Sequence, residues 1–155
     1  MRDMRFVAAH RGGPLSKDHH HLLMIWAVDC AEHILPFFED VAIDDRLRHA
    51  LEVSRAWAKG ETSVGEARKA SVGAMAIARE SVYPASLALA RAIGHAVATA
   101  HMADHSTGAA DYALKAVKAL GESTELERRW QDERPPPEIK ELIISARGVR
   151  GLRIN

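Results

Sequence analysis

Apolar residues recur at intervals of three and four along most of this chain of 155 residues. This spacing places them on one side of an α-helix, whereas a half-buried strand would alternate apolar and polar residues. Alanine, which favours helix more than any other residue, fills many of the apolar positions. Because 155 residues is an ordinary size for one domain, we expect an all-α fold, residues 1–155 forming a single compact bundle of about seven helices.

Capping signals and helix breakers divide the apolar pattern into segments. Ser16 and Ser63 stand where an N-cap would begin a helix, and Pro84 suits a first turn. The seven expected helices cover residues 17–35, 45–60, 64–78, 84–104, 109–120, a short stretch around 126–130, and 138–146. The small side chains of the third, fourth and fifth helices predict a closely packed centre.

The expected helices give the domain three parts. Residues 1–15 form an irregular arm, because Gly12-Gly13-Pro14 interrupts any regular element there. Residues 16–121 form the helical core. Residues 122–155 hold the C-terminal helices and a tail.

The charge balance limits the classes of partner. Lys and Arg together number 21, as do Asp and Glu, so the chain has no overall field that would attract nucleic acid or an anionic membrane. Nowhere do about 18 apolar residues run together without a charge, so we expect no membrane span. The single Cys30 cannot form an internal disulfide, and the N-terminus lacks the apolar stretch of a signal peptide. These features favour a cytoplasmic protein.

Several conspicuous side chains have purely structural interpretations. One cysteine and three tryptophans fall at apolar helix positions, where we expect them in the core, the thiol being unreactive. They are Cys30, Trp26, Trp57 and Trp130. Three arginines near the C-terminus, with no acid among them, are expected to belong to a solvated tail. They are Arg147, Arg150 and Arg153.

Two pairs of potential metal ligands stand four residues apart. Asp29 and His33 would share one face of the first helix, and His101 and His105 one face of the fourth. If the two helices were neighbours, these four side chains could converge on one divalent ion, as in other helical bundles. The alternative is that His101 and His105 are half-buried structural residues that bond to backbone or to Asp104.

The start of the first helix is rich in imidazoles. His19-His20-His21 cannot all reach one ion, because successive helical side chains point about 100° apart. The simpler interpretation is a helix start that faces solvent. Alternatively, His10 and Arg11 could fold over it and form a basic pocket, to which the free N–H groups of residues 17–19 would add the capacity to bind an anion.

Four stretches together resemble a known family. They are AHRGGPL at residues 9–15, DCAEH at 29–33 followed by LP at 35–36, RAWA at 55–58, and GHAVATAH at 94–101 continuing to Asp104-His105. In this order they are similar to the immunity proteins of bacterial polymorphic-toxin systems, over about residues 6–120. The resemblance implies a cytosolic antidote that binds a toxin domain and blocks its active surface, without catalysis. A nuclease is not the favoured target, because antidotes to nucleases are often acidic and this chain is neutral.

Three functional hypotheses therefore stand side by side. The first is a non-catalytic protein that neutralises a cognate toxin by binding it and needs no cofactor. The second is a small hydrolase-like enzyme in which a divalent metal activates water. The third is a homodimeric structural domain. The polar candidates outside the metal set are His10, Arg11, Glu32, His95 and Asp104.

Overall fold

The computed structural model describes residues 2–154, and the side chains of residues 2–148. Within the described residues the fold is all-α, with seven α-helices and no strand. The helices are α1 (Lys17–His33), α2 (Asp45–Ala58), α3 (Val64–Glu80), α4 (Pro84–Ala98), α5 (His105–Ala119), α6 (Thr124–Glu133) and α7 (Pro137–Ile154). Three short 3₁₀-helices accompany them: η1 (Met4–Phe6), η2 (Ala9–Arg11) and η3 (Leu35–Phe38). The predicted fold class and number of helices are confirmed.

The helix starts follow the predicted caps. The hydroxyl oxygen of Ser16 accepts from the N–H of His19 at 3.1 Å, and that of Ser63 accepts from Glu66 at the same distance. Ser123 caps α6 in the same way. Each cap satisfies a donor that the first turn of a helix leaves without an intrahelical partner.

The junction of α4 and α5 differs from the prediction. We expected one helix to run to residue 104 and the next to start at residue 109, but α4 ends at Ala98 and α5 starts at His105. Gly108 falls in the gap expected between these two helices, but in the structure it lies inside α5. A Cβ atom at Gly108 would come within 2.8 Å of Nδ1 of His95 on α4, so this glycine permits close packing of two helices rather than a break.

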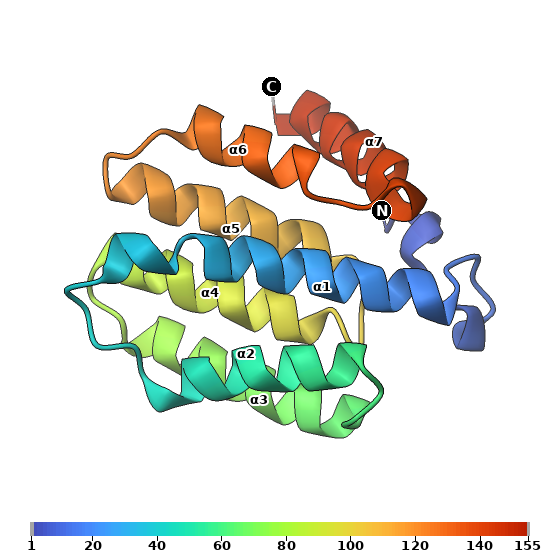
Figure 1. The fold of residues 1–155 in the computed structure, drawn as a ribbon, viewed down its shortest axis with the longest axis horizontal. Coiled ribbons are helices and arrows are strands. Elements are labelled where there is room, and N and C mark those ends of the chain that lie inside the picture. Colours follow the sequence, from blue (N-terminus) through green and yellow to red (C-terminus); the bar gives the residue numbers. More distant parts are fainter. Residues whose placement is uncertain (1, 155) are drawn as a thin grey trace.

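The helices form layers, with α4 and α5 in the middle (Figure 1). In this view α2 and α3 lie below α4, and α6 lies above α5. The contacts of α4 with α5 and with α3 are the most extensive between any two elements. The predicted close-packed centre is therefore correct.

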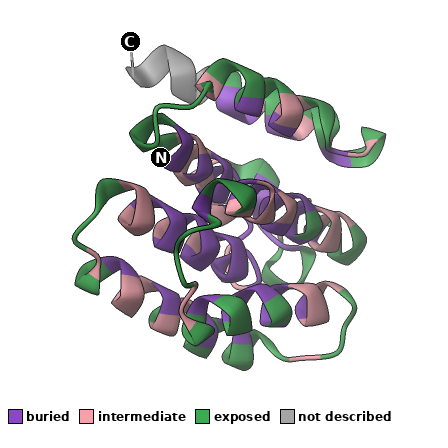
Figure 2. Ribbon diagram, turned by 60° about the vertical axis from the view of Figure 1, so that its left-hand side comes forward, coloured by how far each residue is buried: buried purple, intermediate pink, exposed green. Residues whose placement is uncertain are grey.

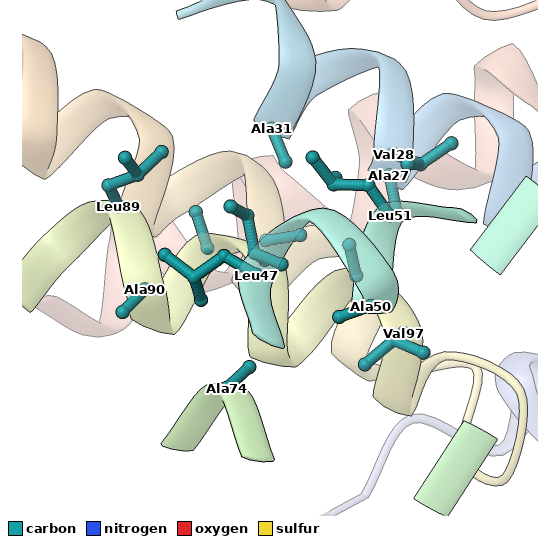
Figure 3. Packing of buried hydrophobic residues seen from close by; sticks show 14 of the residues in the cluster. Ala27, Val28, Ala31, Leu47, Ala50, Leu51, Ala74, Leu89, Ala90 and Val97 are labelled. Atoms are coloured by element: carbon teal, nitrogen blue, oxygen red, sulfur yellow. The ribbon is translucent and has the colours of Figure 1, made fainter. Parts of the chain in front are cut away.

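The main core consists largely of alanines, leucines and valines from α1 to α5. Figure 3 shows Ala27 and Ala31 of α1, Leu47 and Ala50 of α2, and Ala90 of α4 close together. The small alanine side chains among them let the helix backbones approach one another. In Figure 2 the buried residues accordingly lie where helices face each other, and the exposed ones on the outer surfaces.

A second core cluster attaches the arm, α6 and α7 to α1. Trp26 of α1 is 1% exposed and donates from Nε1 to the carbonyl oxygen of Gln131 on α6 at 2.9 Å. Ile139 and Ile143 of α7 and Phe6 of the arm pack into the same cluster. Trp26 and Cys30 are buried here, and burial raises the pKa of the Cys30 thiol well above its ordinary value.

Arg147 corrects the prediction of a solvated basic tail. Its side chain is only 3% exposed and donates to Asp132 and to Gln131, both at 2.8 Å. Helix α7 continues past residue 146 to Ile154, and the buried guanidinium finds its partners on α6. The side chains of Arg150 and Arg153 lie outside the described residues.

One segment contradicts the expectation that no stretch could span a membrane. Residues Lys17–Phe38 have the length and mean hydropathy of a possible span, although half of that window is buried inside the fold. Histidines and isolated acids interrupt the segment, but its mean hydropathy stays high enough for a possible span. In the structure this segment comprises α1 and η3, and α1 packs against α2, α4, α5 and α7.

Candidate functional site

Asp29 and Glu32 of α1 hold arginines rather than standing free. One terminal nitrogen of Arg55, on α2, donates to Asp29 and to Glu32, each at 2.7 Å. Nε of Arg134, just after α6, donates to the other oxygen of Asp29 at 3.2 Å. These ion pairs link α1 to α2 and to the end of α6.

His33 lies beside this network and also has an acidic partner. Its Nδ1 is 2.7 Å from Oε2 of Glu127, a carboxylate of α6 that is 5% exposed. The imidazole stacks on Trp130, with ring centroids 3.6 Å apart and planes 9° from parallel. The DCAEH stretch therefore serves as a clamp that fixes α2 and α6 on α1.

The other pair of predicted ligands belongs to a cluster of histidines at the α4–α5 junction. Nδ1 of His95 lies 3.1 Å from Nδ1 of His105, and the ring centroids of His101 and His105 are 5.5 Å apart. Burial, the largest cause in both cases, lowers the pKa of His101 and of His105. Asp104, next to this cluster, is held by Arg2 of the arm at 2.9 Å. Its side chain therefore bonds to the arm instead of to an imidazole.

The structure does not bring Asp29, His33, His101 and His105 together. Nε2 of His20, near the start of α1, lies 2.6 Å from the carbonyl oxygen of Thr99, so this end of α1 is beside His101. At about 1.5 Å per helical residue, His33 lies about 20 Å further along the axis. Among the described residues no group of three or more histidines, cysteines, aspartates or glutamates could hold a metal ion. The prediction of one four-ligand site is therefore wrong. Asp29 and His33 lie toward the C-terminal end of α1, whereas His101 and His105 lie beside its N-terminal end.

The arm and the first turn of α1 enclose a pocket of about 490 Å³. Its polar lining comprises His10 of the arm, Lys17, His20 and His21 of α1, and Thr62. Burial is the largest cause of the lowered pKa of His20; its bond to the Thr99 carbonyl opposes the shift, and the nearby basic side chains of His21, His10 and Arg11 add to it. We name this site the arm pocket; its remaining lining residues are Ala8, Ala9, Leu15, Trp57, Gly60, Val64 and Ala100.

A surface groove at the other end of α4 was not predicted from the sequence. It has a volume of about 350 Å³, and its lining residues are Val82, Pro84, Leu87, Ala88, Arg91, Tyr112, Lys115 and Ala119. Arg91 and Lys115 lie over the Tyr112 ring, 5.7 Å and 4.6 Å from its centroid. We name this site the α4–α5 groove. The only signal in the sequence was the apolar pair Val82-Tyr83 in a turn, where polar residues are usual.

A family model described as "Imm-5 like putative immunity protein" matches residues 13–138. The chain belongs to this family. The resemblance noted in the sequence is thereby confirmed, although the match starts at Gly13 and extends beyond residue 120, through α6 and into α7. Among curated proteins and among solved structures the comparisons found no match.

Membership of the Imm-5 like family indicates an immunity function. An immunity protein has, in general, a cognate toxin as its partner. The matched region contains the clamp on α1, the histidine cluster and the α4–α5 groove, but only part of the arm. Of these, the α4–α5 groove combines exposed apolar surface with two cations, Arg91 and Lys115, for which the described residues supply no ion-pair partner.

Proposed function

We propose that this Imm-5 like protein neutralises a cognate bacterial toxin by binding it in the cytoplasm, without catalysis and without a cofactor. The family supports an immunity role. The observation that carries the binding proposal is the α4–α5 groove, where apolar and aromatic side chains are exposed beside cations that have no carboxylate partner in the described part of the chain.

The apolar part of this surface extends onto the turn between α3 and α4. Val82 is 87% exposed and Tyr83 is 75% exposed, which leaves a branched and an aromatic side chain in water. Tyrosine is enriched at the energetic centres of protein interfaces, because its ring buries a large area and its hydroxyl can still bond. Exposed residues of this kind next to a groove are typical of a docking surface.

The charged part of the surface determines which partner it fits. Arg91 and Lys115 contact the Tyr112 ring, and within the described residues neither forms an ion pair with a carboxylate. The described lining of the groove contains no aspartate or glutamate. The partner surface should therefore offer carboxylates around an apolar side chain that enters the groove. The groove is locally basic, although the whole chain has no net charge.

A rescue assay tests the proposal. Bacteria that express the toxin encoded beside this gene should grow when the wild-type protein is co-expressed and should die without it. Tyr83→Ser and Lys115→Glu should each abolish or strongly reduce rescue, and weaken toxin binding measured by calorimetry by at least about tenfold, the scale of an interface hot spot.

Two matched substitutions serve as controls. Val72→Ser alters an exposed apolar residue of α3, which is 65% exposed and does not line the groove. Arg48→Glu reverses an exposed charge on α2. Both should rescue as the wild type does. Failure of the wild type to rescue would refute toxin neutralisation, and full rescue by Tyr83→Ser and Lys115→Glu would refute the groove as the docking surface.

A further inference from the structure

The arm pocket lies at the opposite end of α4 from the groove, and the arm forms one of its walls. The N–H of Ala9 donates to the carbonyl oxygen of Leu15 at 2.7 Å, and the N–H of Leu15 donates to that of Val7 at 3.0 Å. Gly13 packs so closely on Val7 that a Cβ atom would overlap it. These contacts fix the arm over the start of α1, so the pocket exists before any ligand enters it.

The ionisable side chains that line the pocket are all basic. Among the described residues, its lining includes His10, Lys17, His20 and His21 but no aspartate or glutamate. Asp18 and Glu61 are neighbours of lining residues in sequence, yet neither lines the pocket. The first turn of α1 also contributes the positive end of its helix dipole, because Lys17 is the first residue of that helix.

His20 provides a largely buried imidazole at this site. The residue is 5% exposed, and its Nε2 lies 2.6 Å from the carbonyl oxygen of Thr99, which can only accept, so Nε2 carries the proton. The neutral ring then has an unprotonated Nδ1, for which the described residues supply no hydrogen-bond partner. Protonation of Nδ1 would require a counter-charge, which the pocket does not contain.

The remainder of the lining is apolar and flat. The Trp57 ring meets the rings of His20 and of His21 edge-on, each with centroids 4.8 Å apart. Leu15 and Val64 complete the apolar wall. A small, strongly hydrated anion would leave this wall uncovered, whereas a ring or short hydrocarbon would bury it.

From this juxtaposition we propose that the arm pocket binds a small organic carboxylate with an apolar, preferably aromatic, body. The carboxylate lies among Lys17, His20 and His21, and the body covers Trp57 and Leu15. The volume of about 490 Å³ is within the range of small-molecule sites. Such a carboxylate arrives either as a free small acid or as a side chain of the partner toxin.

The probe for the test is benzoate, titrated into the full-length protein at pH 6.5 while the histidine ring signals are followed by NMR. We expect saturable shifts of the His20 and His21 signals, and a higher pKa of His20 in the bound state, because a carboxylate stabilises the protonated ring. Benzamide, which has the same shape without the charge, should bind at least about tenfold more weakly, as expected for loss of charge-assisted bonds.

Two charge reversals locate the site. Lys17→Glu should weaken benzoate binding by about tenfold or more, since it removes a cation and adds a repelling carboxylate. It should not unfold α1, because a glutamate suits the first turn of a helix. Lys118→Glu makes the same change at an exposed position of α5 that does not line the pocket, and should leave binding within about twofold of the wild type. Thermal unfolding verifies that both variants are folded.

The outcomes separate this inference from the proposed function, because the titration needs no toxin. Absence of saturable shifts, equal binding of benzamide, or equal weakening by Lys17→Glu and Lys118→Glu would each overturn the pocket assignment. If the Lys17→Glu variant, which binds benzoate poorly, still rescues cells as the wild type does, the carboxylate is a free small acid. If that variant loses rescue while Arg48→Glu keeps it, the carboxylate belongs to the toxin.

Discussion

Arg147 lies where α6 and α7 meet α1. Its guanidinium binds Asp132 and Gln131, and it lies 5.8 Å from the centroid of the Trp26 ring. Burial, the largest influence, lowers its pKa, although Asp132 opposes the shift. A charge at this depth is tolerated because both terminal nitrogens are paired, although the buried Nε has no hydrogen-bond partner among the described residues. A residue that belongs by sequence to a basic tail thus acts as the central polar contact of the second core cluster.

We expect Arg147→Ala to lower the free energy of unfolding by about 2–4 kcal/mol, since it leaves Gln131 without its bond and opens a cavity beside Trp26. The partner Asp132 is 31% exposed, so water can solvate it and the loss stays below that for a fully buried pair. Arg129→Ala, at an exposed position of α6, should change stability by less than about 0.5 kcal/mol. Urea unfolding measures both, and equal losses would contradict this role for Arg147.

Two glycines allow the central helices of this fold to pack closely against their neighbours. Gly94 of α4 faces Met75 of α3, and a Cβ atom there would lie 2.8 Å from its sulfur. Gly108 of α5 faces His95 of α4 in the same way. Both glycines lie in helix interiors, where glycine costs about 1 kcal/mol relative to alanine. Close contact between the central helices offsets that cost.

Gly108→Ala should therefore destabilise the protein by about 1–3 kcal/mol, because the added methyl group forces apart two packed helices. His95 is a rigid ring that is also bonded to His105, so it cannot easily move aside. Gly65→Ala, where the nearest atom to the new methyl group would be Ser63 Oγ at 3.7 Å, should stabilise α3 by about 0.4–1 kcal/mol. Thermal and urea unfolding of the two variants give the comparison, and stabilisation by Gly108→Ala would contradict the packing role.

Most histidines of the molecule lie at one end of the bundle, around the α4–α5 junction and the start of α1. Burial is the largest cause of the lowered pKa of His20, His101 and His105. A folded-state pKa below the unfolded value means that the unfolded chain binds protons first as the pH falls. Stability is then complete above the unfolded histidine pKa of about 6.5 and is progressively lost below it.

We accordingly expect the midpoint of urea unfolding to fall between pH 7.5 and pH 5.5. His101→Gln should reduce this dependence, since it removes a half-buried ring whose protonation opposes folding. His49→Gln, at an exposed position of α2, should leave the dependence as in the wild type. A midpoint that rises on acidification, or that changes equally in both variants, would show that these buried rings do not govern the pH response.

The candidate sites could be predicted from the sequence only in part. The arm was expected as one alternative to fold over the imidazoles at the start of α1, and His10 does line a pocket with His20 and His21. The pairing of Asp29 with Arg55 could not be predicted, because residues 26 positions apart meet only when α2 packs on α1. The α4–α5 groove was missed for the same reason: Tyr112 and Arg91 belong to different helices.

The local structure of this protein could be predicted from the order of its residues: the period of the apolar residues specifies helices, and the serine caps specify where they begin, since both depend on neighbours along the chain. Tertiary structure alone decided what Gly108, Arg147 and the histidine pairs do. Gly108 could break a helix or admit His95, and Arg147 could be solvated or buried. Burial and the approach of a second helix choose between these outcomes, and they depend on residues distant in the sequence.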